Sequence, residues 1–393
     1  MALPPAALPE TEGRRLPDRV TDALAGTRTA IAVYIATRAL LVGVAAADAA
    51  LEHHSLQSAI GHWDGVWYAR LALHGYPAHL VHGPSTLGFL PLFPALIWIL
   101  MQLGIQSPVL AGALISGVGG LVATILVQRL ATGWWGEAAG RRAAILFCLF
   151  PGSVVFSMAY SEGLLIPLAA GCILALERKR WLLAGALAGI ATATAADALA
   201  LTVVCAISAA LMVYRHGPRD REALKSMLAP LLSVTGIAAF AIFLWQWTGT
   251  PFATLHAQRT GWHERLDPVA LVHQGQLFAT QVAHLSSSDL TLDLSPLAAL
   301  VGAVVLVWGL VLLLRRPRLV SFQAITWAAL VGALAAFSEH VGPNARVLVT
   351  AFPVVVVFAY RLRGRAYGWL LGMNAILLVG MSALTFTGHS LTP

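Results

Sequence analysis

Charged residues are scarce in this chain of 393 residues, at 11% of the total. Soluble domains usually carry about 25% charged residues, so the composition excludes a water-soluble globular protein. Hydrophobic residues make up 58% of the chain, and apolar runs of about 20 residues recur along it. The sequence therefore predicts an all-α polytopic membrane protein, and no polar stretch is long enough for a large separate domain.

Lysine is nearly absent, because only Lys179 and Lys225 occur and the other 23 of the 25 basic residues are arginines. The arginines cluster in short connectors between apolar runs, as is typical of cytoplasmic loops. The net charge of +7 is therefore no indication of nucleic-acid binding. Cysteine is also rare, and Cys148, Cys172 and Cys205 all fall inside apolar runs. This placement predicts small core residues and no disulfide framework or metal site.

Apolar runs that could cross the membrane follow a polar N-terminal segment, 1–27, and we expect 28–393 to form one transmembrane domain. The predicted spans are 28–50, 109–130, 142–158, 160–176, 181–196, 198–214, 227–248, 296–314, 320–337, 345–360 and 367–386. A shorter run, 90–103, falls short of the ~30 Å hydrocarbon core at ~1.5 Å per residue. We expect it to be a half-crossing or re-entrant segment in a bundle of about 11–12 helices.

The distribution of arginine predicts which loops share a membrane face. With the N-terminus in the cytoplasm and 90–103 not crossing, every arginine-rich connector lies on the cytoplasmic side. The two long polar loops, 51–89 and 249–295, then lie outside, as does the C-terminus. The polar positions near other span ends, including Asp197, fall on the same outer face. The sequence therefore predicts that its isolated polar groups gather at one side of the membrane.

The first external loop contains the stretch GHWDGVWYAR, 61–70, with Asp64 between Trp63 and the pair Trp67 and Tyr68. Aromatic residues of this kind favour the membrane–water interface. A carboxylate there can act as a general base towards a hydroxyl group. The alternative is an interfacial acid among anchoring aromatics. The loop is also rich in histidine, but no HExxH or similar spacing occurs, so we predict no metal.

Three more ionisable residues stand at the outer ends of apolar spans. Glu162 follows Ser161 at the start of 160–176, where both residues could function in the site or simply cap a helix. Asp197 lies in a long apolar stretch, where an acid is costly and a functional candidate, although it could mark a turn. Arg346 is on the side opposite the arginine-rich loops, which suits pairing with an anionic phosphate or interfacial anchoring.

The second external loop combines basic, amide and aromatic residues: His256, Gln258, Arg259 and Trp262. Such a mixture suits binding of a phosphate or a sugar. It equally suits an amphipathic helix on the membrane surface.

In their order along the chain, these motifs resemble those of the PIG-V-like mannosyltransferases, which belong to the GT-C class of integral-membrane glycosyltransferases. The resemblance covers most of the chain. The matching segments are His62 to Tyr68, Gly75-Tyr76, Phe89 to Pro94, Phe150-Pro151, Tyr160-Ser161-Glu162, Leu187 to Thr192, Pro251-Phe252, His256 to Gln258 with Trp262, and Arg346 with Phe352-Pro353.

The resemblance implies a GT-C-like bundle and an inverting transfer of mannose from a polyprenyl-phosphate donor to an acceptor hydroxyl outside the cytoplasm. It implies Asp64 as the base, Glu162 in support, and Arg346 with His256 at the donor phosphate. No nucleotide sugar, cofactor or metal is implied, and the acceptor stays open among glycolipid, glycan and protein. We expect a bacterial plasma-membrane enzyme. The expected substrate-binding residues are His62, Trp63, Trp67, Tyr68, Tyr76, Tyr160, Glu162, Asp197, His256, Gln258, Arg259, Trp262, His340 and Arg346.

The chain departs from the family pattern at several positions. His62 replaces the usual arginine before the Trp-Asp pair, and Val347 replaces a frequent tyrosine. Ala195, Asp197 and Ala198 stand where an Arg-x-Asn-Gly-like motif is usual. The departures are compatible with altered substrate contacts or with a catalytically silent partner subunit. A transporter or lipid flippase is a further alternative, which would need polar groups along a path near the bilayer midplane.

Overall fold

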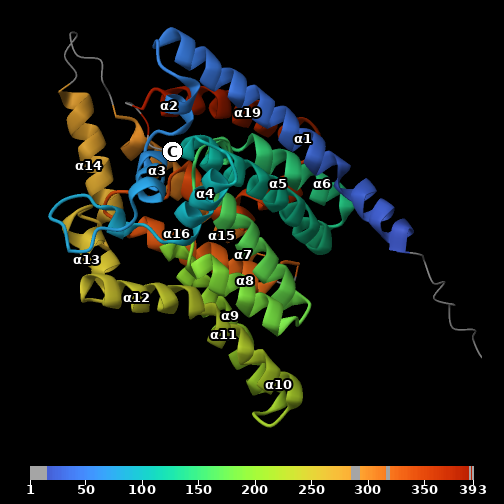
Figure 1. Cartoon of the computed structure of the whole chain (residues 1–393). Helices are drawn as coiled ribbons and strands as arrows, with labels where there is room; N and C mark the ends of the chain where they lie inside the picture. The colour runs from blue at the N-terminus through green and yellow to red at the C-terminus, as the bar shows by residue number, and fades with distance from the viewer. Residues whose placement is uncertain (1–15, 285–292, 316–318, 389–390, 392–393) are drawn as a thin grey trace, which may run out of the picture.

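The computed structural model describes residues 16–284, 293–315, 319–388 and 391. Most of the predicted N-terminal segment, 1–27, lies outside the described residues, as does part of the second polar loop. Within the described ranges the chain forms helices and one isolated β-bridge, between Leu266 and Ser338, and no β-strand (Figure 1). The predicted all-α class is confirmed.

The first half of the chain contains α1 to α9. Their bounds are α1 (Leu16–Leu51), α2 (Leu56–Ile60), α3 (Asp64–His74), η1 (Thr86–Gly88), α4 (Leu92–Gln102), α5 (Pro108–Trp135), α6 (Glu137–Leu149), η2 (Pro151–Ser157), α7 (Glu162–Glu177), α8 (Trp181–Thr192), η3 (Ala196–Ala198) and α9 (Leu199–His216).

The second half contains α10 to α19. Their bounds are α10 (Arg221–Ser226), α11 (Leu228–Ser233), α12 (Thr235–Thr248), α13 (Ala253–Thr260), α14 (Ala270–Ala283), α15 (Ser295–Leu314), α16 (Phe322–Ala336), α17 (Ala345–Thr350), α18 (Phe352–Arg361) and α19 (Gly364–Phe386).

All eleven predicted spans coincide with helical segments. Among the described residues, six segments are long and apolar enough to cross a membrane: Thr27–Leu51, Pro108–Trp135, Ala196–His216, Arg221–Thr248, Ser295–Leu314 and Gly364–Phe386. A bent pair, α6 and η2, would be a seventh. The other four predicted spans correspond to α7, α8, α16 and the consecutive helices α17 and α18, which have 16 residues or fewer each.

Helix α4 covers the short run 90–103. It has 11 residues, which at ~1.5 Å per residue is about half of the ~30 Å needed to cross the hydrocarbon core. It packs against α3 and α5. Its length agrees with the prediction that this run does not cross by itself.

The predicted span 142–158 is bent by 73° between α6 and η2. Pro151 opens η2, and proline cannot continue the hydrogen-bond pattern of the preceding helix. Arg38 of α1 lies against this break, where it donates to the carbonyl and the hydroxyl of Ser153 and to the carbonyl of Cys148. The cation thereby satisfies the carbonyl of Cys148 at the C-terminal end of α6, where positive charge is favourable, and that of Ser153 in η2.

Helices α5 and α7 approach closely through glycine. A Cβ atom at Gly119 would collide with the backbone carbonyl of Gly163, and one at Gly163 would collide with the backbone of Ser116. Small residues allow such approach between membrane helices. Because Gly163 adjoins Glu162, this contact fixes the start of α7.

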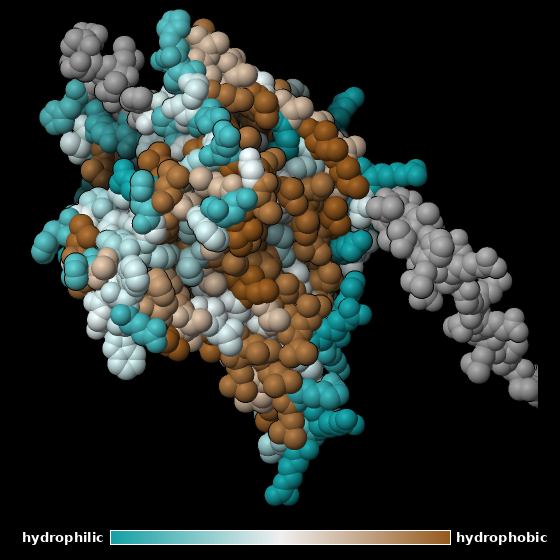
Figure 2. Space-filling view, in the orientation of Figure 1, coloured by the Kyte–Doolittle hydropathy of each residue, from teal (hydrophilic) through white to brown (hydrophobic). Residues whose placement is uncertain are grey.

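The three cysteines are buried and free, as predicted for core residues. Large apolar side chains are instead exposed on the sides of the bundle, for example Ile376 and Trp369. Figure 2 shows an apolar zone across the middle of the visible face, with hydrophilic residues gathered towards its upper left and along its right edge. This distribution is typical of a protein whose sides face lipid.

The bundle has polar contacts at each of its two ends. At one end, Trp134 of α5 donates to Glu177 of α7, and Tyr367 of α19 donates to the carbonyl of Arg142 in α6. At the other end, α3 and α13 contact η1, and α14 donates from Gln274 to the carbonyl of Glu339. The helices α2, α3, α13 and α14 lie at this second end (Figure 1).

We predict that Gly119→Ala destabilises the protein by about 2 kcal/mol, because the added Cβ atom forces α5 and α7 apart. Gly133→Ala in the same helix is the matched control, since a Cβ atom there would meet nothing within 4 Å. Thermal unfolding of the two variants in detergent measures the difference. Equal melting temperatures for Gly119→Ala and Gly133→Ala would contradict the close contact.

Candidate active site

Asp64 is the first residue of α3, and the residue before it holds an unusual backbone conformation. Trp63 has φ +60°, which few residues other than glycine adopt. Its indole nitrogen donates to the carbonyl of Thr385 in α19 at 3.1 Å. The amide of Asp64 donates to the hydroxyl of Tyr160 at 3.3 Å. These contacts anchor the start of α3 against two distant parts of the chain and aim the Asp64 carboxylate.

Arg346 binds two acids at once. Its Nη1 lies 2.7 Å from Oδ2 of Asp64, and its Nε lies 3.1 Å from Oε1 of Glu162. The three residues come from the first turns of α17, α3 and α7, so three segments far apart in sequence meet here. We call Asp64, Glu162 and Arg346 the carboxylate–arginine cluster. Charge-assisted hydrogen bonds of this kind are about twice as strong as neutral ones.

Exposure differs within the carboxylate–arginine cluster. The side chain of Asp64 is 29% exposed, that of Arg346 21% and that of Glu162 12%. Asp64 is therefore the carboxylate more open to a molecule that approaches from outside, and Glu162 is the more enclosed one. Oε2 of Glu162 is buried and has no hydrogen-bond partner among the described residues.

Two tyrosines line the inner side of the carboxylate–arginine cluster. The buried ring of Tyr160 lies 5.5 Å from the guanidinium carbon of Arg346, within cation–π distance. Tyr68 donates to the hydroxyl of Ser161 at 2.8 Å. Burial raises the pKa of Tyr68 well above its usual range, so this phenol stays neutral and keeps donating. Ser161 makes no side-chain cap on α7, because its hydroxyl is engaged by Tyr68.

Asp197 lies at the same end of the bundle. It occupies the short helix η3 between α8 and α9, so it does mark a turn between two spans. It is also within electrostatic reach of Arg346 and Glu264. The polar groups at 64, 162, 197 and 346 therefore share one end of the bundle. Within the described ranges, no three histidine, cysteine or acidic residues are arranged to hold a metal ion.

A family model described as mannosyltransferase (PIG-V) matches residues 43–266, which is more than half of the chain. The chain belongs to the PIG-V mannosyltransferase family. Asp64, Glu162 and Asp197 lie inside the matched region, whereas Arg346 lies beyond it. Membership of this family, together with the apolar helices, supports a multi-pass membrane glycosyltransferase. No curated protein matches the chain.

Solved structures of an oligosaccharyltransferase from Archaeoglobus fulgidus are similar to this PIG-V family member. The apo form has a TM-score of 0.46 and 13% identity, over 92% of this chain and 56% of that one. The same enzyme, AglB, in complex with an inhibitory peptide and a dolichol-phosphate has a TM-score of 0.45 and 12% identity over the same shares. The chain thus spans little more than half the length of these proteins.

Aromatic residues predicted for substrate binding form a second group beside the carboxylate–arginine cluster. Trp67 stacks on Phe89 with ring centroids 6.2 Å apart and meets Trp262 edge-on at 4.8 Å. Trp262 also donates to the carbonyl of Ser85, and Gln258 donates to the carbonyl of Gly88. These contacts join the second long polar loop to the first, and Tyr68, edge-on to Phe89 at 5.1 Å, links them to the carboxylate–arginine cluster.

Tyr76 lies in a different environment. Its hydroxyl donates to the carbonyl of Phe89, and its ring packs against Phe240 and Phe243 of α12. Burial raises the pKa of Tyr76 above the normal range. The contacts place this residue between the first loop and α12, so its observed role is to hold the two together.

The remaining predicted residues make other contacts, and none of those described is with the carboxylate–arginine cluster. The ring of His62 lies beside Gly388 and 6.1 Å from that of His54. His256 and Arg259 lie on α13, half-buried and exposed respectively. His340 is 3.9 Å from Glu264. Residues 256–259 belong to the short helix α13, and its location on the membrane surface stays a prediction.

Arg38 is the residue that the sequence analysis missed. It is a charged residue in the middle of an apolar span, which is the same signal that singled out Asp197. Its hydrogen bonds hold the break that leads into Tyr160, Ser161 and Glu162. It therefore positions the segment that carries one acid of the carboxylate–arginine cluster, without contacting that cluster.

We predict that Arg346→Gln destabilises the protein by about 2 kcal/mol, because it leaves two carboxylates close together without a counter-charge. Adding Glu162→Gln to that variant restores part of the loss, since one of the repelling charges is then gone. Arg265→Gln, at an exposed position at the same end of the helical bundle, is the matched control. Denaturant unfolding of the wild type, Arg346→Gln, Glu162→Gln and the double variant gives a double-mutant cycle, with Arg265→Gln measured beside them. Additive effects would contradict the shared pairing.

Proposed function

We propose that this protein transfers a sugar, mannose, from a polyprenyl-phosphate donor to an acceptor hydroxyl on the non-cytoplasmic face, with inversion at the anomeric carbon. The observation that carries the proposal is the meeting of Asp64, Glu162 and Arg346 at one end of an apolar helical bundle. Family membership supplies the reaction class. The acceptor is a glycolipid, a glycan or a protein hydroxyl.

Asp64 is the proposed general base. Its carboxylate is the most exposed member of the carboxylate–arginine cluster, and its position is fixed through the amide contact with Tyr160 and the anchored Trp63. In the reaction it takes the proton of the acceptor hydroxyl. The acceptor oxygen forms a bond to the anomeric carbon from the side opposite the phosphate. The bond between the anomeric carbon and the phosphate oxygen breaks, and both of its electrons go to the phosphate oxygen.

Arg346 is the proposed partner of the donor phosphate. A guanidinium presents five N–H donors in a planar fork, and the contacts with Asp64 and Glu162 occupy only two of its nitrogens. Positive charge near the departing phosphate stabilises the charge that develops as the bond breaks. Glu162 holds the guanidinium from its enclosed side, and its buried Oε2 is an acceptor that a hydroxyl of the sugar can satisfy.

The orientation in the membrane follows from the two ends of the bundle. The carboxylate–arginine cluster, Asp197 and both long polar loops are at one end, whereas Arg142 in the first half of α6, Arg178 after α7 and Arg361 at the end of α18 are at the other. Arginine-rich connectors favour the cytoplasm. We therefore place the site at the external face. The acids do not follow a path through the middle of the bundle, so nothing in their arrangement favours a transporter.

We predict that Asp64→Asn lowers transfer by about 100- to 10,000-fold, because the amide cannot accept the proton of the acceptor. The assay uses purified full-length protein, polyprenyl-phosphate mannose and a panel of lipid acceptors. Asp267→Asn is the matched control, since Asp267 pairs with His273 in the second external loop, and it leaves the rate unchanged.

Two results would refute the proposal. Full transfer by Asp64→Asn, with melting temperature and membrane insertion intact, would remove Asp64 from its role as base. Absence of transfer by the wild-type chain with every donor and acceptor tested, despite donor binding, would favour a catalytically silent family member.

A further inference from the structure

Helix α7 has two chemically different faces. Glu162, Leu165, Ile166 and Ala169 belong to the buried face that packs into the bundle. The face that contains Leu164 points the other way, because Leu164 is two residues after Glu162 and two residues turn an α-helix by about 200°. The second face forms the floor of a groove on the side of the protein, with a cavity volume of about 980 Å³.

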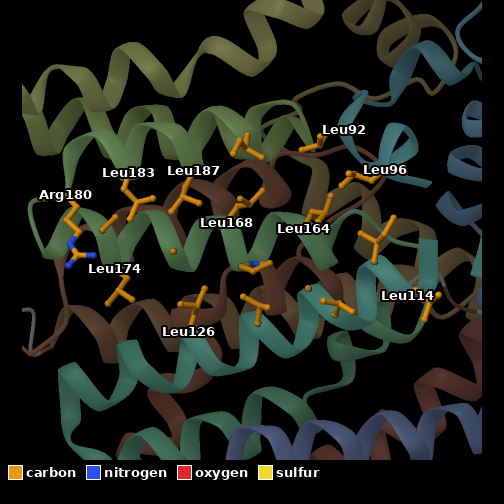
Figure 3. Close-up of a pocket in the computed structure, with 18 of the residues that line it drawn as sticks. Leu92, Leu96, Leu114, Leu126, Leu164, Leu168, Leu174, Arg180, Leu183 and Leu187 are labelled. Carbon is orange, nitrogen blue, oxygen red and sulfur yellow. The ribbon is translucent and has the colours of Figure 1, made fainter. Parts of the chain in front are cut away.

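The groove runs along most of α7. Its walls come from α5 and α8, and α4 closes the end nearer to Glu162. Figure 3 shows Leu92, Leu96 and Leu114 at one end, Leu126, Leu168 and Leu187 between, and Arg180 at the other end. The lining is leucine, isoleucine, valine and other apolar residues except for two arginines, Arg178 and Arg180.

Both arginines are available to a ligand. Arg178 and Arg180 are exposed, and within the described parts of the chain neither side chain makes a hydrogen bond or ion pair. The neighbouring acid, Glu177, accepts a hydrogen bond from Trp134. Lys179, which stands between the two arginines in the connector from α7 to α8, adds a third positive charge. The groove therefore combines a long apolar floor with a concentration of positive charge at one end only.

We infer that this groove binds an anionic phospholipid, with its phosphate on Arg178 and Arg180 and its acyl chains along α7. Basic pockets between transmembrane helices recognise anionic lipid head groups, and each nearby arginine strengthens the attraction. The apolar floor adds a favourable surface for hydrocarbon chains, which fill a furrow that protein side chains leave open. The lipid belongs to the leaflet opposite the carboxylate–arginine cluster, because α7 has Glu162 at its first turn and Arg178 just after its last.

The bound lipid is distinct from the proposed sugar donor. Glu162 and Arg178 are separated by the 16 residues of α7, or roughly 24 Å at 1.5 Å per residue. A donor phosphate held by Arg346 cannot also contact Arg178. The groove and the carboxylate–arginine cluster also lie on opposite faces of α7. The lipid site therefore stands independently of the proposed reaction.

The test measures lipid retention by native mass spectrometry of the full chain. Protein in detergent micelles is titrated with dioleoylphosphatidylglycerol or with dioleoylphosphatidylcholine. We expect the double variant Arg178→Gln/Arg180→Gln to weaken binding of phosphatidylglycerol by roughly thirtyfold, from the contribution of two arginines near an anionic head group. Gly171→Phe fills the floor of the groove beside Leu187 and is expected to abolish binding of this lipid.

Arg215→Gln/Arg219→Gln is the matched control, because it removes the same charge from exposed positions in the last turn of α9 and just after it, neither of which lines the groove. It should retain phosphatidylglycerol as the wild type does, and all variants should keep the wild-type melting temperature in detergent alone. Equal binding of both lipids by the wild type, or unchanged binding by Arg178→Gln/Arg180→Gln, would overturn the proposal. Displacement of phosphatidylglycerol by undecaprenyl phosphate would also overturn it and assign the groove to a polyprenyl chain.

Discussion

The sharing of one guanidinium by two carboxylates is the interaction on which the architecture of the site depends. Arg346 brings together the first turns of α3, α7 and α17, which are separated by long stretches of apolar helix. Two carboxylates held close together repel each other, and the guanidinium that contacts both of them offsets this repulsion. The helices of the bundle can differ in length and packing, but their ends must meet where one arginine reaches both acids.

Other contacts in the fold position the helices that carry the two acids. The break between α6 and η2, filled by Arg38, turns the chain so that Tyr160 and Ser161 precede α7 at the correct end. The glycine contact between α5 and α7 then fixes the position of α7 against α5. Trp63, anchored on α19, does the same for α3. Glu162 therefore depends on the glycine contact and on Arg38, and Asp64 depends on the hydrogen bond of Trp63.

Composition and charge were sufficient to predict the helical class and the gathering of Asp64, Glu162, Asp197 and Arg346 at one end, because isolated polar groups are costly elsewhere in a membrane protein. Their pairing was not predictable, since it depends on how α3 and α17 enter the bundle. The left-handed turn at Trp63 and the bend after α6 are also tertiary effects. The apolar periodicity of α7 gave no hint of its groove, because leucine facing a neighbouring helix and leucine facing lipid look alike in sequence.

The pairing of Asp64 with Arg346 has a consequence for the order of events in the proposed reaction. In the structure, Oδ2 of Asp64 lies 2.7 Å from Nη1 of Arg346, so one oxygen of the proposed base is already engaged by the cation. An arriving phosphate competes for the same guanidinium and loosens that contact. Under the proposed mechanism, the Asp64 carboxylate would be released towards the acceptor hydroxyl only once the activated sugar is in place, which would favour binding of the lipid donor first and limit loss of the sugar to water.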